Sequence, residues 1–138
     1  MNQLTGKWKG SYNYYDEDDQ FCDETYFEMD ILIDNGVITG EINDADEKVT
    51  IPMVAKVDGF CENNSISFIK QYPALWYIDE KGNVIIDESK KHPEIHYQGD
   101  IKDDEIFGTW SIYTKAQQYG YGYFEEVTQG TWTVKKEN

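Results

Sequence analysis

The aromatic side chains of this sequence have the type and spacing that ligand binding requires. In extended segments they recur at alternate positions, so they share one face of each strand. Aromatic rings supply contact area, and phenol hydroxyls can orient a guest. We predict a small-molecule site lined by Trp8, Tyr12, Tyr14, Phe27, Met29, Tyr97 and Trp110. Trp76 is a further candidate for this face, and the alternative interpretation is that all of these rings fill a core.

A second group of residues could bind a protein. In QYGYGY, Tyr119, Tyr121 and Tyr123 alternate with glycines, and exposed tyrosines make adhesive surfaces. An acidic turn contributes Asp16, Asp18 and Asp19, which would attract a basic partner. This pattern indicates a module that covers a basic protein, such as an immunity protein or an inhibitor. The alternatives are a strand packed by its glycine face and turns that are merely solvated.

Metal binding and catalysis lack comparable support. His92 and His96 have the same strand parity, but no third ligand accompanies them. The acidic segments lack the glycine and glutamate spacing of a calcium loop. No nucleophile elbow, phosphate-binding loop or C-x-x-C motif occurs. We therefore predict no metal, no cofactor and no enzymatic activity.

Charge and hydropathy narrow the class of partner. The chain carries 12 basic and 27 acidic residues, a net charge of -15, and every basic residue is lysine. The negative charge and the absence of arginine argue against nucleic-acid binding, because that binding depends on the neutralisation of phosphates. No apolar run is long enough to span a membrane. The opening segment lacks the apolar region of a signal peptide, so we expect a cytoplasmic protein with reduced Cys22 and Cys61. The expected partner is a small neutral or cationic molecule, or a basic protein.

The elements that must position these residues are short strands. Apolar and polar residues alternate between turn signals such as Asn35-Gly36, which is typical of an all-β barrel or sandwich. We predict a single domain over residues 1–138, an antiparallel up-and-down β-barrel of about eight to ten strands. The expected strands are Lys7–Tyr15, Thr25–Asp34, Val37–Asn43, Val49–Val57, Ser65–Tyr72, Leu75–Asp79, Asn83–Asp87, Ile95–Lys102, Ile106–Ile112 and Thr128–Lys135.

A glycine stands two residues before a tryptophan three times, in GKWKG, GTWSI and GTWTV. Residues i and i+2 lie on the same face of a strand. We predict that each glycine makes room on the concave face for the tryptophan that follows it in the same strand. The first and last strands both carry the motif, which favours a barrel in which they meet.

The opening G-x-W, formed by Gly6, Lys7 and Trp8, resembles that of the calycin group of lipocalins, fatty-acid-binding proteins and avidins. The total length is also similar. This resemblance implies an up-and-down β-barrel that holds a small molecule at its mouth. It implies no particular ligand, because the arginines that some of these families use are missing here.

Overall fold

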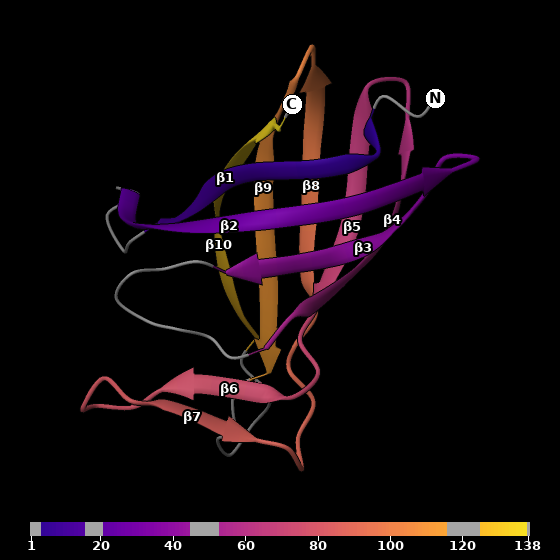
Figure 1. Cartoon of the computed structure of the whole chain (residues 1–138). Helices are drawn as coiled ribbons and strands as arrows, with labels where there is room; N and C mark the ends of the chain where they lie inside the picture. Colours follow the sequence, from indigo (N-terminus) through magenta and orange to yellow (C-terminus); the bar gives the residue numbers. More distant parts are fainter. Residues whose placement is uncertain (1–3, 16–20, 45–52, 116–124, 138) are drawn as a thin grey trace.

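The architecture is a closed antiparallel barrel of eight strands, with a separate two-stranded sheet at one end (Figure 1). It is seen in a computed structural model that describes residues 4–15, 21–44, 53–115 and 125–137. The strand order around the barrel is β1-β10-β9-β8-β5-β4-β3-β2. Neighbours in sequence are therefore neighbours in space, apart from the inserted pair β6 and β7. The predicted all-β up-and-down antiparallel barrel is confirmed.

Most strand boundaries agree with the alternation in the sequence. The strand expected at Val49–Val57 is wrong, because Met53 and Val54 are not in a strand and β4 runs from Ala55 to Glu62. The barrel strands are β1 (Gly6–Tyr15), β2 (Phe21–Asp34), β3 (Val37–Asp44), β4 (Ala55–Glu62), β5 (Ser65–Gln71), β8 (Ile95–Lys102), β9 (Glu105–Lys115) and β10 (Glu125–Lys136). The second sheet pairs β6 (Leu75–Ile78) with β7 (Val84–Asp87). In Figure 1, β1, β2 and β3 cross in front of β5, β8 and β9, so two curved walls face each other. The described part of the chain contains no helix with the length and hydropathy that a membrane crossing needs.

Alternate positions of the strands fill the barrel interior. On β2, Glu28 and Asp30 are exposed, whereas the residues that alternate with them are buried, namely Phe27, Met29, Ile31 and Ile33. The next strand is reached through Asn35 and Gly36, whose φ angles of 51° and 78° are those of a type I′ turn. The predicted hairpin at this dipeptide is therefore present.

Two of the three glycine-tryptophan motifs pair with each other across adjacent strands. Gly108 of β9 lies opposite Trp132 of β10, and Trp110 of β9 lies opposite Gly130 of β10. Each indole therefore has a glycine of the neighbouring strand beside it. The prediction placed the matching glycine earlier in the same strand, and this detail is wrong. The register between two strands decides which glycine faces which ring. The spacing of residues within one strand carries no information about that register.

Because the glycines have no side chains, each indole extends across the neighbouring strand to the strand beyond it. Trp110 donates from its Nε1 to the carbonyl of Asn13 on β1, at 3.1 Å, across Gly130. A methyl group on Gly130 would overlap that same carbonyl and lie 2.7 Å from the indole nitrogen. Trp132 likewise donates to the carbonyl of Gln98 on β8, at 3.0 Å. The two indoles thus tie four consecutive strands together.

The first motif works differently. Trp8 donates from its Nε1 to the carbonyl of Leu4, at 2.9 Å, so its indole bonds to the segment that precedes its own strand. Gly6 has a φ angle of 135°, a conformation that side chains disfavour. The closure of the ring is as predicted, because β1 and β10 pair along their length, with Tyr12 opposite Trp132.

The β6–β7 sheet lies across one end of the barrel (Figure 1). It is inserted between β5 and β8, which pair directly with each other. A backbone hydrogen bond from Leu75 to the carbonyl of Lys90, 3.0 Å long, holds the two ends of the insertion together. This arrangement closes one end of the barrel with residues of the insertion and its flanking segments.

Replacing Gly130 by alanine tests the glycine-tryptophan pairing. The added methyl group has no space between the Asn13 carbonyl and the Trp110 indole. We expect the Gly130→Ala variant to lose about 1–3 kcal/mol of unfolding free energy or more, as overpacked sites do, when measured by urea denaturation. Thr131→Ala, in the same strand, is the control. A loss for Gly130→Ala no larger than for this control would contradict the pairing.

Candidate functional site

A cavity of about 150 Å³ lies inside the barrel at the end covered by β6 and β7. Its wall combines barrel residues with residues of the insertion. The lining side chains are Tyr12, Lys70, Tyr72, Trp76, His92, Ile95, Tyr97, Trp110 and Ile112. Elsewhere the interior is packed with buried aliphatic and aromatic side chains. The barrel is therefore filled along most of its length and hollow at this end.

Three rings close the covered end of the cavity. Tyr72 follows β5, Trp76 belongs to β6, and His92 lies in the segment before β8. Tyr72 meets the edges of the other two rings, with centroids 5.4 Å from Trp76 and 4.9 Å from His92. Trp76 and His92 stack at 5.9 Å. Edge and stacked contacts of this kind stabilise a ring cluster beyond its buried area, so the cluster attaches the insertion to the barrel.

The cavity wall contains a lysine that is almost fully withdrawn from water. The side chain of Lys70 is 1% exposed, and its Nζ lies 2.9 Å from Oδ1 of Asp44, whose side chain is 0% exposed. Tyr72 donates its hydroxyl hydrogen to the other carboxylate oxygen of Asp44. Removing two charges from water costs several kcal/mol for each ion, which their mutual contact and hydrogen bonds must offset.

Aromatic rings surround the ammonium group. The Nζ atom of Lys70 lies 4.9 Å from the ring centroid of Tyr72, 5.2 Å from that of Tyr12 and 6.0 Å from that of Phe27. These distances are within the range in which a ring face attracts a cation. The rings therefore replace part of the hydration that the buried charge has lost.

Burial sets the protonation of this group. Desolvation lowers the pKa of the Lys70 ammonium, and the carboxylate of Asp44 opposes that effect. Desolvation also raises the pKa of the Tyr72 phenol, and the negative charge of Asp44 adds to this. Tyr72 therefore keeps its proton and remains a hydrogen-bond donor. The amine of Lys70 is easier to deprotonate than that of a lysine in water.

Two further polar groups line the cavity. The Nε1 atom of Trp76 is buried and has no hydrogen-bond partner among the described residues. His92 places its Nδ1 2.9 Å from the carbonyl of Pro93, so Nδ1 carries the hydrogen and Nε2 is the acceptor in the neutral ring. Burial lowers the pKa of His92, which favours that neutral ring. The residues of the wall thus include one buried donor without a described partner, together with a charge pair that sums to zero.

The structure brings together part of the residues predicted to line a site. Tyr12, Tyr97 and Trp110 line the cavity. Phe27 and Met29 are buried in the packed core, and Trp8 lies towards the opposite end, beside a separate hollow of about 360 Å³.

The other predicted residues are not described. The side chain of Tyr14 is outside the described part of the structure, although its backbone belongs to β1. The proposed partner-binding residues also lie outside the described residues: Asp16, Asp18, Asp19, Tyr119, Tyr121 and Tyr123.

Sequence reasoning missed the charged part of the wall. Lys70 continues the inward row of β5 after Ile66 and Phe68, and Asp44 continues the inward row of β3 after Ile42. A charge at an inward position in each of two strands was therefore a visible signal. The pairing itself depends on the fold, since 26 positions separate the two residues. Among the described residues, no three His, Cys, Asp or Glu side chains are grouped to hold a metal ion.

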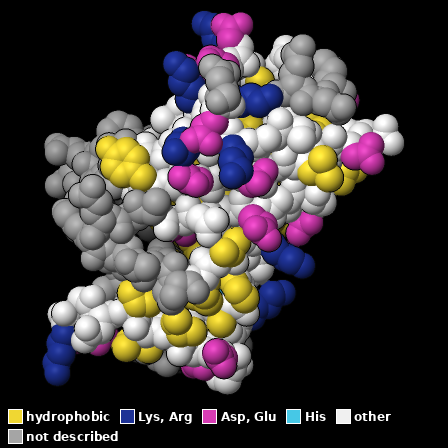
Figure 2. Space-filling view, viewed as in Figure 1, with side chains coloured by type: hydrophobic (Ala, Val, Ile, Leu, Met, Phe, Trp, Pro, Cys, Tyr) yellow, Lys and Arg dark blue, Asp and Glu magenta, His cyan; other side chains and the backbone are white. Residues whose placement is uncertain are grey.

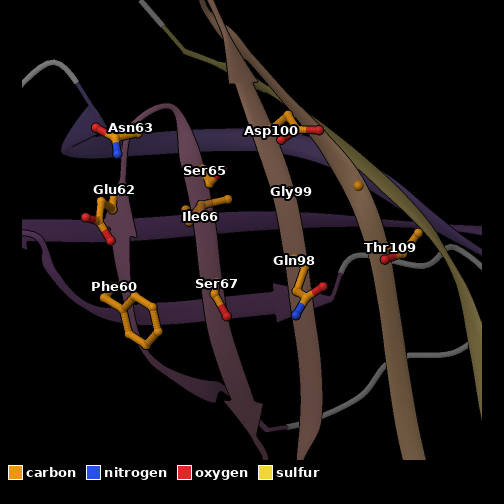
Figure 3. A pocket seen from close by; sticks show the side chains of 11 residues that line it. Phe60, Glu62, Asn63, Ser65, Ile66, Ser67, Gln98, Gly99, Asp100 and Thr109 are labelled. Atoms are coloured by element: carbon orange, nitrogen blue, oxygen red, sulfur yellow. The ribbon is translucent and has the colours of Figure 1, made fainter.

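The outer surface carries a second, more open hollow of about 660 Å³. Figure 3 shows it over β5, β8 and their neighbours, with Ser67 and Gln98 on adjacent strands and Phe60 beside them. The ring of Phe60 is 61% exposed, and the charged residues of this outer groove are Glu62 and Asp100. Figure 2 shows, on another face, lysines and carboxylates intermixed over β1–β3 and apolar side chains gathered over β6 and β7.

The fold and the cavity define a class: a closed antiparallel up-and-down β-barrel with a partly open hollow at one end. Comparison with protein-family models and with curated proteins finds no match for this chain.

Proposed function

We propose that the protein binds a small, neutral, largely apolar molecule with one hydrogen-bond acceptor in the covered cavity. The observation that carries this proposal is the buried Nε1 of Trp76, a donor without a described partner in the wall of a hollow. A buried donor without a partner costs free energy. A guest that accepts its hydrogen would remove that cost.

Size and charge restrict the guest. A cavity of about 150 Å³ suits a molecule of the size of benzene. The positive charge of Lys70 is balanced by Asp44, so neither an anion nor a cation finds an uncompensated charge there. A cationic guest would also meet the lysine itself, which favours the neutral form of the expected ligand. The resemblance to the calycin group supports the same proposal, because those barrels hold small molecules.

Pyridine and benzene test the proposal as a matched pair, since they share a shape and differ in one acceptor nitrogen. We expect both to bind with one-to-one saturation, and the indole N–H signal of Trp76 in ¹H-¹⁵N NMR to shift downfield with pyridine. Trp76→Phe should weaken pyridine binding about 2- to 10-fold relative to benzene, the loss of one hydrogen bond. Trp8→Phe, at the other end, is the control. The proposal fails if neither probe saturates.

A second candidate function is favoured by the outer groove. Glu62 and Asp100 are exposed there beside the exposed ring of Phe60, and none of the described residues that line the groove is a lysine. Carboxylates around an aromatic anchor suit a basic protein segment. Under this second proposal the protein is an acidic module that covers a basic partner.

A labelled decalysine peptide tests this second function by fluorescence anisotropy. Glu62→Gln combined with Asp100→Asn should weaken binding more than Glu80→Gln combined with Glu88→Gln, which removes the same charge from the β6–β7 insertion. Wild-type binding should also weaken steeply with added salt, because screening acts over about 10 Å at 0.1 M. Equal losses for the two double variants would show that the net charge alone attracts the peptide.

A further inference from the structure

We propose that the amine of Lys70 captures a small aldehyde inside the covered cavity as an imine. This inference rests on the proposed small-molecule site and names the class of its guest. Its starting observation is a lysine in the wall of a small hollow, with a side chain that is 1% exposed and has aromatic rings around its amine. Buried ion pairs can often be replaced by apolar side chains without loss of stability. A stable barrel therefore does not require an amine at this position, whereas carbonyl chemistry does.

Imine formation requires an uncharged amine. Lysines serve as carbonyl nucleophiles where a hydrophobic pocket disfavours their ammonium form. Lys70 meets this condition through its burial, because its side chain is 1% exposed and its ammonium form has lost nearly all contact with water. The carboxylate of Asp44, 2.9 Å away, can take the proton that the amine must release. The desolvation that lowers the pKa of Lys70 favours the same transfer.

The steps balance without an oxidant or a reductant. A proton passes from the ammonium of Lys70 to Asp44, and the freed electron pair of Nζ adds to the carbonyl carbon. The carbonyl oxygen takes up a proton as the nitrogen loses one, which gives a neutral carbinolamine. Asp44 then protonates the departing hydroxyl, which leaves as water while the C=N bond forms. The product is an iminium ion beside an ionised Asp44, with the same total charge as the starting pair.

The other wall residues have roles that fit this guest. The Nε1–H of Trp76 can donate to the aldehyde oxygen, and this polarises the carbonyl for attack. Tyr72 holds Asp44 through its hydroxyl hydrogen, and therefore acts as a positioning residue. The limited volume of about 150 Å³ favours an aldehyde with one ring or a short chain.

Benzaldehyde with sodium cyanoborohydride tests the proposal on the wild-type protein, because the reductant converts an imine into a stable benzylamine. Peptide mapping by mass spectrometry then compares Lys70 with the exposed Lys81 in the same molecule. We expect Lys70 to be labelled on the order of tenfold faster, as a positioned nucleophile would be. Pyridine should slow labelling at Lys70 and leave Lys81 unchanged. Benzaldehyde labelled with ¹³C at the carbonyl gives an independent reading by NMR, since the imine carbon is detected without reduction.

The outcomes separate this inference from the proposed function. Fast labelling of Lys70 that pyridine suppresses, or an imine signal that Lys70→Met abolishes, supports imine capture. If pyridine saturates the cavity but neither assay detects an imine at Lys70, the inference is wrong and the non-covalent function stands. If neither pyridine nor benzaldehyde binds, both proposals are overturned.

Discussion

The pairing of Lys70 with Asp44 is the interaction on which the covered end of the barrel depends. Two charges have been withdrawn from water, and each needs compensation from its surroundings. The partner carboxylate, the Tyr72 hydroxyl and the aromatic rings supply it. Tyr72 also packs against Trp76 and His92, so the side chain that compensates the charge also anchors the insertion. The ion pair and the cover therefore form one unit.

Closure of the barrel holds together the strands that form the cavity wall around this ion pair. The indoles of Trp110 and Trp132 cross the glycines of adjacent strands and bond to the carbonyls of Asn13 and Gln98. These bonds hold β1, β10, β9 and β8 together, and three of the four strands carry rings of the cavity wall, namely Tyr12, Trp110 and Tyr97. The ring of Trp110 meets that of Tyr12 edge-on, with centroids 5.9 Å apart. The repeat that is conspicuous in the sequence thus serves the cavity indirectly, by fixing the strands that bear its rings.

Much of this fold follows from the sequence alone, because alternation and turn residues are local signals. Asn35-Gly36 marks its hairpin, and the inward row of β2 is legible from its apolar residues. The partner of each indole was not predictable in the same way, since it depends on the register between β9 and β10. The charged residues of the cavity wall were only partly predictable from the sequence. Lys70 and Asp44 occupy inward positions that the pattern shows, but a lysine at the end of a strand can also extend its amine into water. The fold decides this, because it places Asp44, Tyr12, Phe27 and Tyr72 around the amine.

The titration of Lys70 measures directly whether its buried amine is desolvated. Proton and carbon signals of the lysine ε-methylene groups can be followed by NMR from neutral to alkaline pH, and Lys70 can be assigned by the signal that Lys70→Met removes. We expect Lys70 to lose its proton below the ordinary lysine value of 10.5, because desolvation outweighs the attraction of Asp44. A Lys70 signal that titrates at or above 10.5 would show that the amine is solvated or held charged, and would contradict the desolvated ion pair described above.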